Sequence, residues 1–454
     1  MILRRILIAN RGEIAVRVLR SCQRLGIEAV LAASDADLDS VPARLADSVI
    51  RLGPAAAADS YLSVDAVVAA ALAAGADAVH PGYGFLSENP ELARACNAAG
   101  LVFIGPTADQ LTAVGDKLTA RRHATAAGLP VAPGGEVADA GEAMALAAEI
   151  GFPVLVKAVA GGGGRGLRPV LRPDALARVM PLAMAEAAAA FGDSRVYLER
   201  YLPAGRHVEV QLLGDGERVV HLGDRDCSVQ RRYQKLVEEA PAPLLDDDLR
   251  GAIHRAAVAF GAHLSYRGLG TVEFLVEPAG RAFWFLEMNA RIQVEHPVTE
   301  AITGLDLVAE QIWVAEGNPL RLAQPDVTVA GHAIECRINA EDWADDFRPS
   351  PGTVIAAVFP AGPGIRVDTH VQPGAAVPPW YDSLLAKLIV SGTDRTAALA
   401  GLRAALARCE IAGVATTLGL HERIMATPEF AAGGVDTTFL DRLLQPEPAG
   451  GRRG

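Results

Sequence analysis

A chain of 454 residues is long enough for about three domains, and half of its residues are hydrophobic, so a sizeable core is available. Its formal net charge of −12 disfavours a nucleic-acid-binding surface, which needs a basic stripe that this sequence lacks. No apolar run approaches the ~20 residues that span a membrane, the N-terminal apolar run is too short for a signal peptide, and the five scattered cysteines form no CxxC pair. These features predict a soluble, reduced, cytoplasmic protein that binds neither membranes nor nucleic acid.

The first 110 residues alternate short apolar runs with helical stretches. This alternation favours a parallel sheet of the doubly wound type. The turn Asn10–Glu13, between the first strand and the first helix, superficially suggests nucleotide binding, but it lacks GxGxxG and is weak evidence. The predicted strands are Arg5–Ala9, Glu28–Ala33, Ala78–His80 and Val102–Ile104, and the predicted helices are Glu13–Leu25 and Ser63–Ala74.

The pattern changes at Pro130–Gly141, a stretch rich in Pro, Gly and Ala that predicts a domain boundary. From Glu142 to Leu202 the sequence predicts a helix, a strand, a glycine-rich loop, a long alanine-rich helix and another strand. From His207 to about His296 it predicts strands of alternating polarity joined by hairpins.

The remaining residues mix both patterns. We predict a helix at Ala301–Glu316, β-structure at His332–Asn339 and Gly352–Asp368, and a helix at Arg395–Ala407. The tail Gln445–Gly454, which is rich in Pro, Gly and Arg, is predicted to be disordered. The sequence contains no internal repeat, and its elements together predict a protein of mixed α/β and α+β class.

Only four lysines stand against thirty-eight arginines, which makes each of Lys117, Lys157, Lys235 and Lys387 informative. At positions where either basic side chain would be suitable, this chain nearly always has Arg. A retained Lys therefore favours a site that needs a compact, strongly hydrated point charge, such as a phosphate or small-oxyanion site. The alternative is chance retention of four solvated lysines. For Lys387, which lies in an apolar run, a structural role is the better explanation.

A glycine-rich loop follows one of these lysines. Lys157 ends an apolar strand, and Gly161–Gly166 contains five glycines. Consecutive glycines let backbone N–H groups close on phosphate oxygens with no Cβ in the way, and a strand-end lysine beside such a loop suits a triphosphate. The alternative is a flexible surface loop.

The most specific stretch is Glu287–Glu295, in which polar and apolar residues alternate. If the whole stretch were extended, all of its polar side chains would lie on one face. The turn Pro278–Arg281 predicts a hairpin that places Glu273 roughly opposite Glu287. Facing carboxylates repel, and a Mg²⁺ ion that bridges phosphates would resolve the conflict. The alternative is a solvated edge strand. The alternating polar residues are Glu287, Asn289, Arg291, Gln293 and Glu295.

Two further stretches carry weaker signals. His80–Asn89 is a Gly- and Pro-rich turn after a strand, and its position at a carboxyl end of the parallel sheet favours ligand binding. His207, Glu209 and Gln230 offer groups that bind hydroxyls, although each alone is more often a satisfied structural residue.

Together these residues resemble biotin carboxylase, an ATP-grasp enzyme, from about Leu3 to about Leu443. The matching stretches are Ile8–Ala15, His80–Asn89, Gly115–Lys117, Gly161–Gly166, Arg225–Arg232, Glu287–Thr299 and Glu335–Asp342. The resemblance implies an N-terminal domain at residues 1–113, an ATP-grasp domain at 114–330 with a mobile lid at about 131–203, a C-terminal domain at 331–444 and a tail at 445–454.

The resemblance also implies roles for individual residues. Catalytic roles fall to Glu295, Arg337, Lys235 and Arg291, with Glu295 as the base and Arg337 stabilising the biotin enolate. ATP would be bound by Lys117, Lys157, Gly162, Gly163, Gly164, Glu199, Leu202, His207, Gln230, Glu273 and Glu287, and Mg²⁺ or Mn²⁺ by Glu273, Glu287 and Asn289. Bicarbonate would be bound by Lys235, Arg291, Gln293 and Val294, and biotin by Tyr83 and Arg337, with Asp382 close by.

The implied reaction is ATP- and bicarbonate-dependent carboxylation of biotin through carboxyphosphate. It is the first half-reaction of an acetyl-CoA or other acyl-CoA carboxylase, such as the one that begins fatty acid biosynthesis. No lysine follows a methionine, so the biotinylation motif Met-Lys-Met is absent. The resemblance therefore implies that a separate biotin carboxyl carrier protein and carboxyltransferase subunits are partners of this chain.

The resemblance further implies a homodimer, with Arg20 and Arg366 at interface positions. Five residues depart from the usual pattern. Tyr233 stands where many relatives have His, and Arg200 where many have Lys. Ala160 interrupts what is often a longer glycine run, Arg24 stands where a Glu is common, and Pro363 where an aromatic is common. Arg24 adds a third positive charge to those of Arg20 and Arg366. Because like charges at an interface repel, we expect a weak dimer.

Two other functions compete with this interpretation. One is an ATP-grasp ligase that activates a different carboxylate, which the bicarbonate set and Arg337 disfavour. The other is a nucleotide-binding regulatory subunit without turnover. The absence of a catalytic carboxylate from the sequence would favour it, but every expected carboxylate is present.

Overall fold

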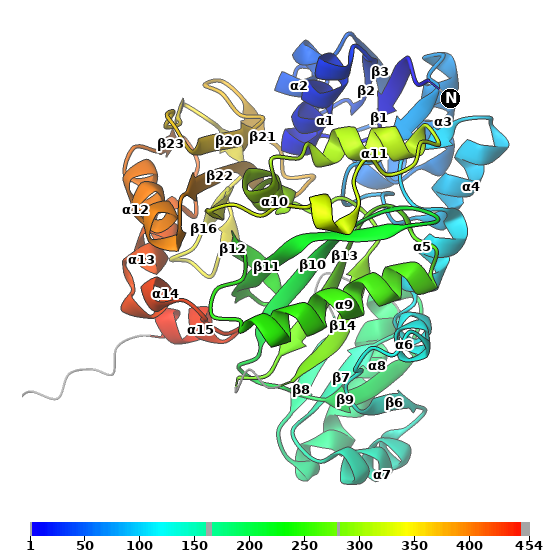
Figure 1. Ribbon diagram of the computed structural model, residues 1–454, viewed down its shortest axis with the longest axis vertical. Helices are drawn as coiled ribbons and strands as arrows, with labels where there is room; N and C mark the ends of the chain where they lie inside the picture. Colours follow the sequence, from blue (N-terminus) through cyan, green and yellow to red (C-terminus); the bar gives the residue numbers. More distant parts are fainter. Residues whose placement is uncertain (1, 160–165, 279–281, 446–454) are drawn as a thin grey trace, which may run out of the picture.

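The computed structural model describes residues 2–159, 166–278 and 282–445 and arranges them in three parts (Figure 1). Residues of all three parts line one cavity. Gly162, Gly163 and Gly164, predicted to contact the nucleotide, lie outside the described residues, as does the predicted tail from residue 446 onward.

The N-terminal part is a parallel sheet in the order β3-β2-β1-β4-β5, as predicted. The predicted strands and helices here are confirmed, with ends shifted by at most one residue. The turns after β1 and β4 meet, because Asn10 Nδ2 donates to the carbonyl oxygens of Pro81 and Tyr83, both at 2.7 Å. The elements are β1 Arg5–Ile8, α1 Gly12–Leu25, β2 Glu28–Ser34, α2 Val41–Leu45, β3 Ser48–Gly53, α3 Val64–Ala73, β4 Ala78–His80, α4 Pro90–Ala98, β5 Val102–Phe103 and α5 Ala108–Gly115.

The second part consists of the central sheet, described below, and a segment that we call the lid. The lid lies at the bottom of Figure 1 and comprises residues 134–159 and 166–200. Its antiparallel sheet, in the order β6-β9-β7-β8, packs against α7 and α8. Strand β6 lies within the stretch predicted to be only a boundary, and β8 was not predicted; both have mixed burial that periodicity does not reveal. The elements are α6 Lys117–Ala126, which precedes the lid, β6 Gly134–Val137, α7 Ala140–Ile150, β7 Val154–Ala158, β8 Leu167–Val170, α8 Pro173–Phe191 and β9 Val196–Arg200.

An antiparallel sheet of eight strands, in the order β14-β13-β10-β11-β12-β15-β22-β20, forms the centre of the molecule. It runs across the predicted boundary near residue 330, because β12 pairs with β15. Helix α9 packs on β10 and β13, and α10 packs on β12, β15 and β22. The elements are β10 Arg206–Asp215, β11 Val219–Arg231, β12 Gln234–Ala240, α9 Asp247–His263, β13 Arg267–Val276, β14 Phe283–Asn289, α10 His296–Thr303, α11 Leu307–Ala315, β15 His332–Asn339, β20 Ile365–Thr369 and β22 Leu384–Gly392.

The prediction of one helix at Ala301–Glu316 is wrong, because two helices occupy this region. Helix α10 ends at Gly304, whose φ of 74° is left-handed backbone that glycine adopts readily. Helix α11 begins after Asp306, whose side chain accepts a hydrogen bond from the backbone N–H of Ala309.

The C-terminal part packs four helices and several short strands against the far end of the central sheet. The region predicted as β at Gly352–Asp368 contains three short strands rather than a long one. The elements are β16 Glu341–Asp342, β17 Arg348–Pro349, β18 Gly352–Thr353, β19 Ala356–Val358, β21 Ala376–Val377, α12 Arg395–Leu406, β23 Glu410–Ala412, α13 Leu418–Ala426, α14 Pro428–Ala432 and α15 Phe439–Leu444.

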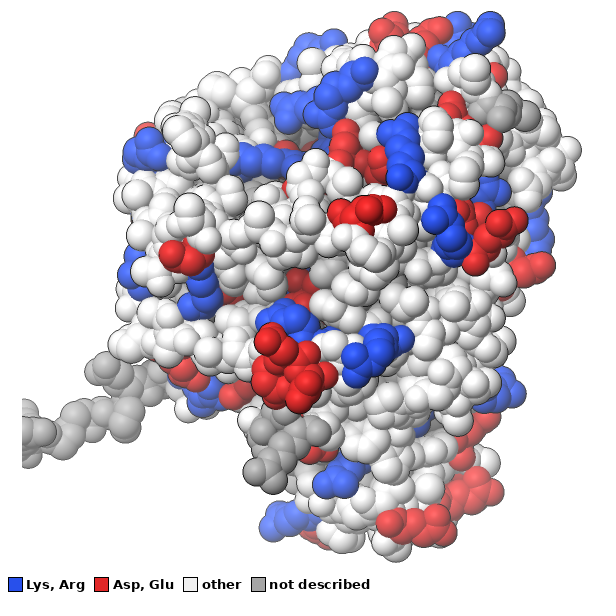
Figure 2. Space-filling view, viewed as in Figure 1, with Lys and Arg blue, Asp and Glu red and all other residues white. Residues whose placement is uncertain are grey.

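Among the described residues, no helix has both the length and the apolar character needed to cross a bilayer. Figure 2 shows basic and acidic side chains interspersed over one face of the molecule. That mixture agrees with the net charge of −12 and differs from the basic stripe of a nucleic-acid surface.

Candidate active site

A cavity of about 1020 Å³ lies where the three parts meet, and it gathers residues that are far apart in the sequence. Glu295 does not line it directly but lies fully buried beneath it, bonded to two residues that do. The predicted site residues that line the cavity are Tyr83, Lys117, Lys157, Glu199, Leu202, His207, Gln230, Lys235, Glu273, Glu287, Asn289, Arg291, Gln293, Val294, Arg337 and Asp382.

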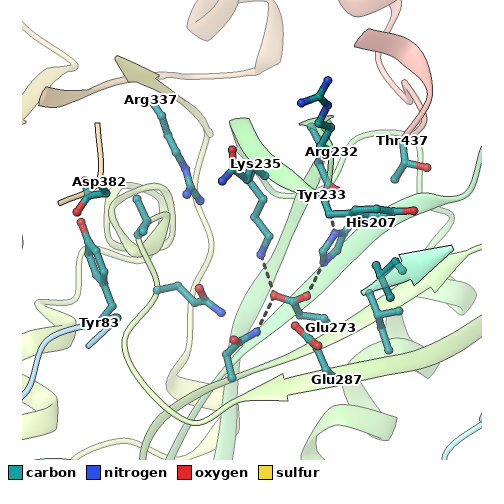
Figure 3. A pocket seen from close by; sticks show the side chains of 18 of the residues that line it. Tyr83, His207, Arg232, Tyr233, Lys235, Glu273, Glu287, Arg337, Asp382 and Thr437 are labelled. Atoms are coloured by element: carbon teal, nitrogen blue, oxygen red, sulfur yellow. Dashed lines mark hydrogen bonds and ion pairs between the residues drawn. The ribbon is translucent and has the colours of Figure 1, made fainter. Parts of the chain in front are cut away.

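Lys235 lies at the centre of the site and contacts three carboxylates. Its Nζ is 2.8 Å from Glu273 (Figure 3). It is also 2.7 Å from Glu295, and it pairs with Glu209. Burial opposes the charge of the ammonium, but these carboxylates outweigh burial and raise the pKa of Lys235 well above its usual value. Lys235 therefore stays charged and holds three elements of the site together.

The expectation that Glu287–Glu295 is extended throughout is wrong for its second half. Strand β14 ends at Asn289, and Glu295 is the residue that precedes α10. The helix begins at His296-Pro297, where proline has a φ already suited to the first turn. Glu295 consequently reaches the site from a helix N-terminus rather than from a strand face.

Glu295 is an ionised, fully buried carboxylate. Lys235 Nζ contacts one of its oxygens, and an Nη of Arg337 donates to the other at 2.9 Å. Burial opposes its charge, but Lys235, Arg337 and the buried Arg225 outweigh burial and hold the pKa of Glu295 well below its ordinary value. Such a carboxylate can accept a proton once a second anion lies beside it.

The predicted juxtaposition of Glu273 and Glu287 is confirmed, because the two residues are directly opposite in the β13–β14 pair. Burial and the charge of Glu273 raise the pKa of Glu287. Glu273 is held ionised, despite burial, by Lys235 and by His207 at 2.9 Å. Two facing carboxylates beside an amide form a donor set that fits Mg²⁺.

Asn289 is oriented by its neighbours on both sides. Its Nδ2 donates to Glu273 at 2.8 Å, and its Oδ1 accepts from Arg291 at 2.9 Å. The amide oxygen has a second lone pair, so ligation of a metal ion remains open to it. Arg291 is fixed in turn by Glu88, with Nε to carboxylate at 2.9 Å.

Lys117 and Lys157 lie on the lid side of the cavity. Lys157, at the end of β7, forms a close ion pair with Glu199 of β9, and Arg121 pairs with the same carboxylate at 3.0 Å. Burial lowers the pKa of Lys117, with Glu287 opposing it. Two lysines that converge on one edge of the cavity give the compact positive charge that a polyphosphate requires.

His207 and Gln230 lie together opposite the lid. Gln230 Nε2 contacts His207 Nδ1 at 2.5 Å, and the other ring nitrogen of His207, Nε2, lies 2.9 Å from Glu273. Tyr233 lies at the β11–β12 turn with 43 % of its surface exposed and borders the same region in Figure 3. Leu202 follows β9 at the edge of the cavity.

At the opposite end, Tyr83 and Asp382 lie near Arg337 (Figure 3). The Tyr83 hydroxyl donates to buried Glu13, whose carboxylate is 3.0 Å from Lys387 Nζ. Lys387 also donates to the backbone oxygen of Val294 at 2.8 Å. Lys387 is therefore structural in the sense that it supports a residue lining the cavity.

Sequence reasoning assigned several carboxylates of the site no role, or only a weak one. Glu209, expected only to offer a hydroxyl-binding group, bridges Lys235 and Arg225, and Glu238 contacts Arg337. Glu13 and Glu88 lie inside stretches already singled out, so their position was a usable signal. Glu238 had no such signal, because only strand pairing brings it to the site.

Comparisons with known proteins agree with this geometry. Three family models match in order: the biotin carboxylase N-terminal domain at residues 2–111, the carbamoyl-phosphate synthase L chain ATP-binding domain at 116–323, and the biotin carboxylase C-terminal domain at 335–442. The chain is 50 % identical to the biotin carboxylase of Nostoc sp. over 97 % of this chain and 99 % of the relative. It is 48 % identical to a pyruvate carboxylase subunit from Methanothermobacter thermautotrophicus, over 96 % of this chain and 89 % of the relative.

A solved structure has the same architecture. The biotin carboxylase domain dimer of Hydrogenobacter thermophilus 2-oxoglutarate carboxylase, in complex with MgADP, ADP and bicarbonate, superposes with a TM-score of 0.94 at 43 % identity, over 99 % of this chain and all of that one. Three matching domains in order, near-complete coverage and one shared fold place this chain in the biotin carboxylase family.

Proposed function

We propose that this chain uses ATP and bicarbonate to carboxylate biotin, as an ATP-dependent ligase. The observation that carries this proposal is the position of Glu295. The carboxylate lies between Lys235 and Arg337, beneath a cavity that the two facing carboxylates Glu273 and Glu287 also line, and Lys235 contacts Glu273 as well. A base, an anion site and a metal-phosphate site thus adjoin one another.

In the first stage bicarbonate lies against Lys235, Arg291, Gln293 and the backbone of Val294. Glu295 takes the bicarbonate proton, and the bicarbonate oxygen attacks the γ-phosphorus of ATP as the bond to ADP breaks, which gives carboxyphosphate. Lys235 and Arg291 supply fixed positive charge where negative charge develops, and they need no rearrangement at that moment.

In the second stage carboxyphosphate breaks into CO₂ and phosphate. Phosphate removes the ureido proton of biotin, and the resulting enolate forms its new bond to the carbon of CO₂. Arg337 offers a planar fork to the enolate oxygen. Tyr83 and Asp382 lie beside this end of the cavity and border the proposed biotin site.

On the nucleotide side, Lys117 and Lys157 bind the phosphates, Glu199 and the backbone of Leu202 hold adenine, and His207 and Gln230 contact ribose. Glu273, Glu287 and Asn289 would hold Mg²⁺ or Mn²⁺, which when bound neutralises phosphoryl charge. Gly162, Gly163 and Gly164 would cover the phosphates, a role that lies outside the described residues.

A single assay tests the proposal: bicarbonate-dependent ATP hydrolysis by the purified chain, with and without free biotin. We expect hydrolysis that biotin stimulates. Stimulation by a different acceptor, and not by biotin, would instead identify another ATP-grasp ligase. MgATP binding with no hydrolysis under either condition would identify a regulatory role without turnover.

We further propose the domain limits 1–113, 114–330 and 331–444, which follow the family matches closely. We also propose a cytoplasmic location, which the unpaired state of all five cysteines supports. The partners are a biotin carboxyl carrier protein and carboxyltransferase subunits. The final acceptor could be acetyl-CoA, another acyl-CoA or an oxo acid, because the similar proteins include part of a pyruvate carboxylase and a 2-oxoglutarate carboxylase domain.

The carrier proposal makes a direct prediction. Since no lysine of this chain follows a methionine, the purified protein should carry no covalent biotin. Intact-mass analysis after co-expression with a biotin ligase should give the mass of the unmodified chain. A biotin adduct would show that this chain is its own carrier.

A second prediction concerns assembly. A cavity of about 590 Å³ is lined by Arg17, Arg20, Arg24 and Arg366, but Glu300, Asp306 and Asp368 interleave with these cations. Arg24 pairs with Asp306 inside the same chain, so the like-charge conflict expected from the sequence is partly relieved. We predict a homodimer through this face that weakens with salt. Light scattering at low and high salt tests it, and a dimer indifferent to salt contradicts it.

A further inference from the structure

Behind Arg337 lies a pair of carboxyl groups that the proposed reaction does not use. Glu238 of β12 and Glu335 of β15 are direct partners in antiparallel register, and both are completely buried. They lie on the sheet face that α10 covers, because the next residue of each strand on that face, Ala240 or Ala333, packs with Val298 of α10. Directly opposed residues place their side chains in contact range.

The hydrogen bonding of this pair is incomplete unless it holds a proton. Arg337 Nε donates to one oxygen of Glu238 at 2.5 Å. Within residues 2–159, 166–278 and 282–445, no donor reaches the other oxygen of Glu238 or either oxygen of Glu335. Two facing carboxyl groups without donors can satisfy each other only if one of them is protonated, and two adjacent buried negative charges would be strongly unfavourable.

The surroundings show which member keeps the proton. Burial raises the pKa of Glu335 well above its ordinary value, with Lys387 opposing, and burial raises the pKa of Glu238 to about 7, with Arg337 opposing. Glu238 has a direct cationic partner and Glu335 has none within salt-bridge distance among the described residues. The charged and titratable groups that interact electrostatically with the pair are Arg337 and Cys336 on β15, Lys235 on β12, Lys387 on β22, Cys227 on β11 and Glu295 before α10.

We propose that Glu335 is protonated and donates a hydrogen bond to ionised Glu238. Glu238 is then a positioning residue that holds Arg337 in place during turnover. This inference rests on the proposed roles of Glu295 and Arg337. The Arg337 guanidinium has two carboxylate partners, Glu238 and Glu295. When Glu295 becomes neutral by taking the bicarbonate proton, its ion pair with Arg337 weakens. Glu238 then remains as the anion that keeps the guanidinium facing the biotin end of the cavity.

The direction of the pH dependence follows from this arrangement. The pair of Glu238 with Arg337 needs the ionised form of Glu238. As the pH falls through about 7, Glu238 takes up a proton and its hold on Arg337 is lost. Biotin-dependent turnover should therefore decline on the acid side of about pH 7.

Three variants separate the two carboxyl groups. We call the decline of biotin-dependent turnover below about pH 7 the acid limb of the pH profile. Glu335→Gln keeps a neutral hydrogen-bond donor beside Glu238, so turnover should stay within about threefold and the acid limb should not move. Glu335→Leu removes the donor and should shift the acid limb to higher pH. Glu238→Gln should abolish that limb and lower biotin-dependent turnover by about tenfold or more, with KM for ATP unchanged. An acid limb that moves about one pH unit lower in Glu335→Gln would show that Glu335 is normally ionised and would overturn the proposal.

Infrared difference spectroscopy tests the proton directly and does not depend on activity. At about pH 8, where ordinary carboxyl groups are ionised, the unchanged protein should show the C=O stretch of a protonated carboxylic acid that Glu335→Gln lacks. Absence of that band in the unchanged protein overturns the proposal. If the band is present but biotin does not stimulate ATP hydrolysis, the shared proton is supported and the proposed function is refuted.

Discussion

Replacing Glu295 with glutamine is expected to lower bicarbonate-dependent ATP hydrolysis by about 10²–10⁴-fold, the usual effect of losing a general base. Glutamine has nearly the same shape and can still accept a hydrogen bond from one of the two cations, Lys235 or Arg337, but it cannot accept a proton from bicarbonate. Because Glu295 lies beneath the cavity rather than among the proposed phosphate ligands, MgADP affinity should change little. Steady-state ATPase assays and calorimetric titration with MgADP measure the two quantities.

The low pKa of Glu295 is compatible with this role. In the structure Lys235 and Arg337 outweigh burial and stabilise its charge. An anion bound between Lys235 and Arg291 adds negative charge beside Glu295 and so raises its affinity for a proton. Glu186→Gln, at an exposed ion pair of the lid with Arg168, is a matched control that should leave activity unchanged. Equal activity in Glu295→Gln and this control would remove Glu295 from the role of base.

Replacing Lys235 with arginine, which keeps the positive charge, is expected to lower turnover by roughly 10²-fold or more. The ammonium contacts three carboxylates from a buried position, and a planar guanidinium does not fit the same three directions. Arg291 already places one guanidinium beside the proposed bicarbonate site, so a second would misplace the reacting oxygen. Measured kcat/KM for bicarbonate should fall sharply, while nucleotide binding is largely spared.

Lys387→Arg is a poor control for this variant, because Lys387 is completely buried and donates to the Val294 backbone. Arg168→Lys, at the exposed ion pair with Glu186, exchanges the same two cations at the surface and should be nearly neutral. If Lys235→Arg is as active as Arg168→Lys, only the positive charge of Lys235 matters. The inference that a retained lysine marks a site that needs a compact ammonium is then wrong.

The parts of the fold that the sequence predicts well are those with strong local periodicity. The N-terminal strands and helices and the strand His332–Asn339 agree with the structure to within a residue. The pairing of Glu273 with Glu287 could be predicted because a hairpin is a local structure. Short strands of mixed burial, such as Gly134–Val137, have no period to detect, and the break at Gly304 depends on one glycine inside an otherwise helical pattern.

The candidate site shows the same division. Residues inside ordered motifs, such as Lys235 and Arg337, could be assigned to the cavity before its shape was known. Glu238 could not, because strand β12 reaches Arg337 only through pairing between distant segments. The position of Glu295 at a helix start, rather than on a strand, also depends on where Pro297 begins the helix.

The scarcity of lysine has a consequence for chemical labelling. Lys117, Lys157 and Lys235 line the cavity and Lys387 lies behind it, so none of the four side-chain amines of this chain is on the exposed surface. Reagents that acylate amines can therefore react only with the chain's N-terminal amine and with amines at the active site. Loss of activity on acylation, and its protection by MgATP, would report on that cavity alone, and coupling of this protein to a support or a fluorophore must use groups other than lysine.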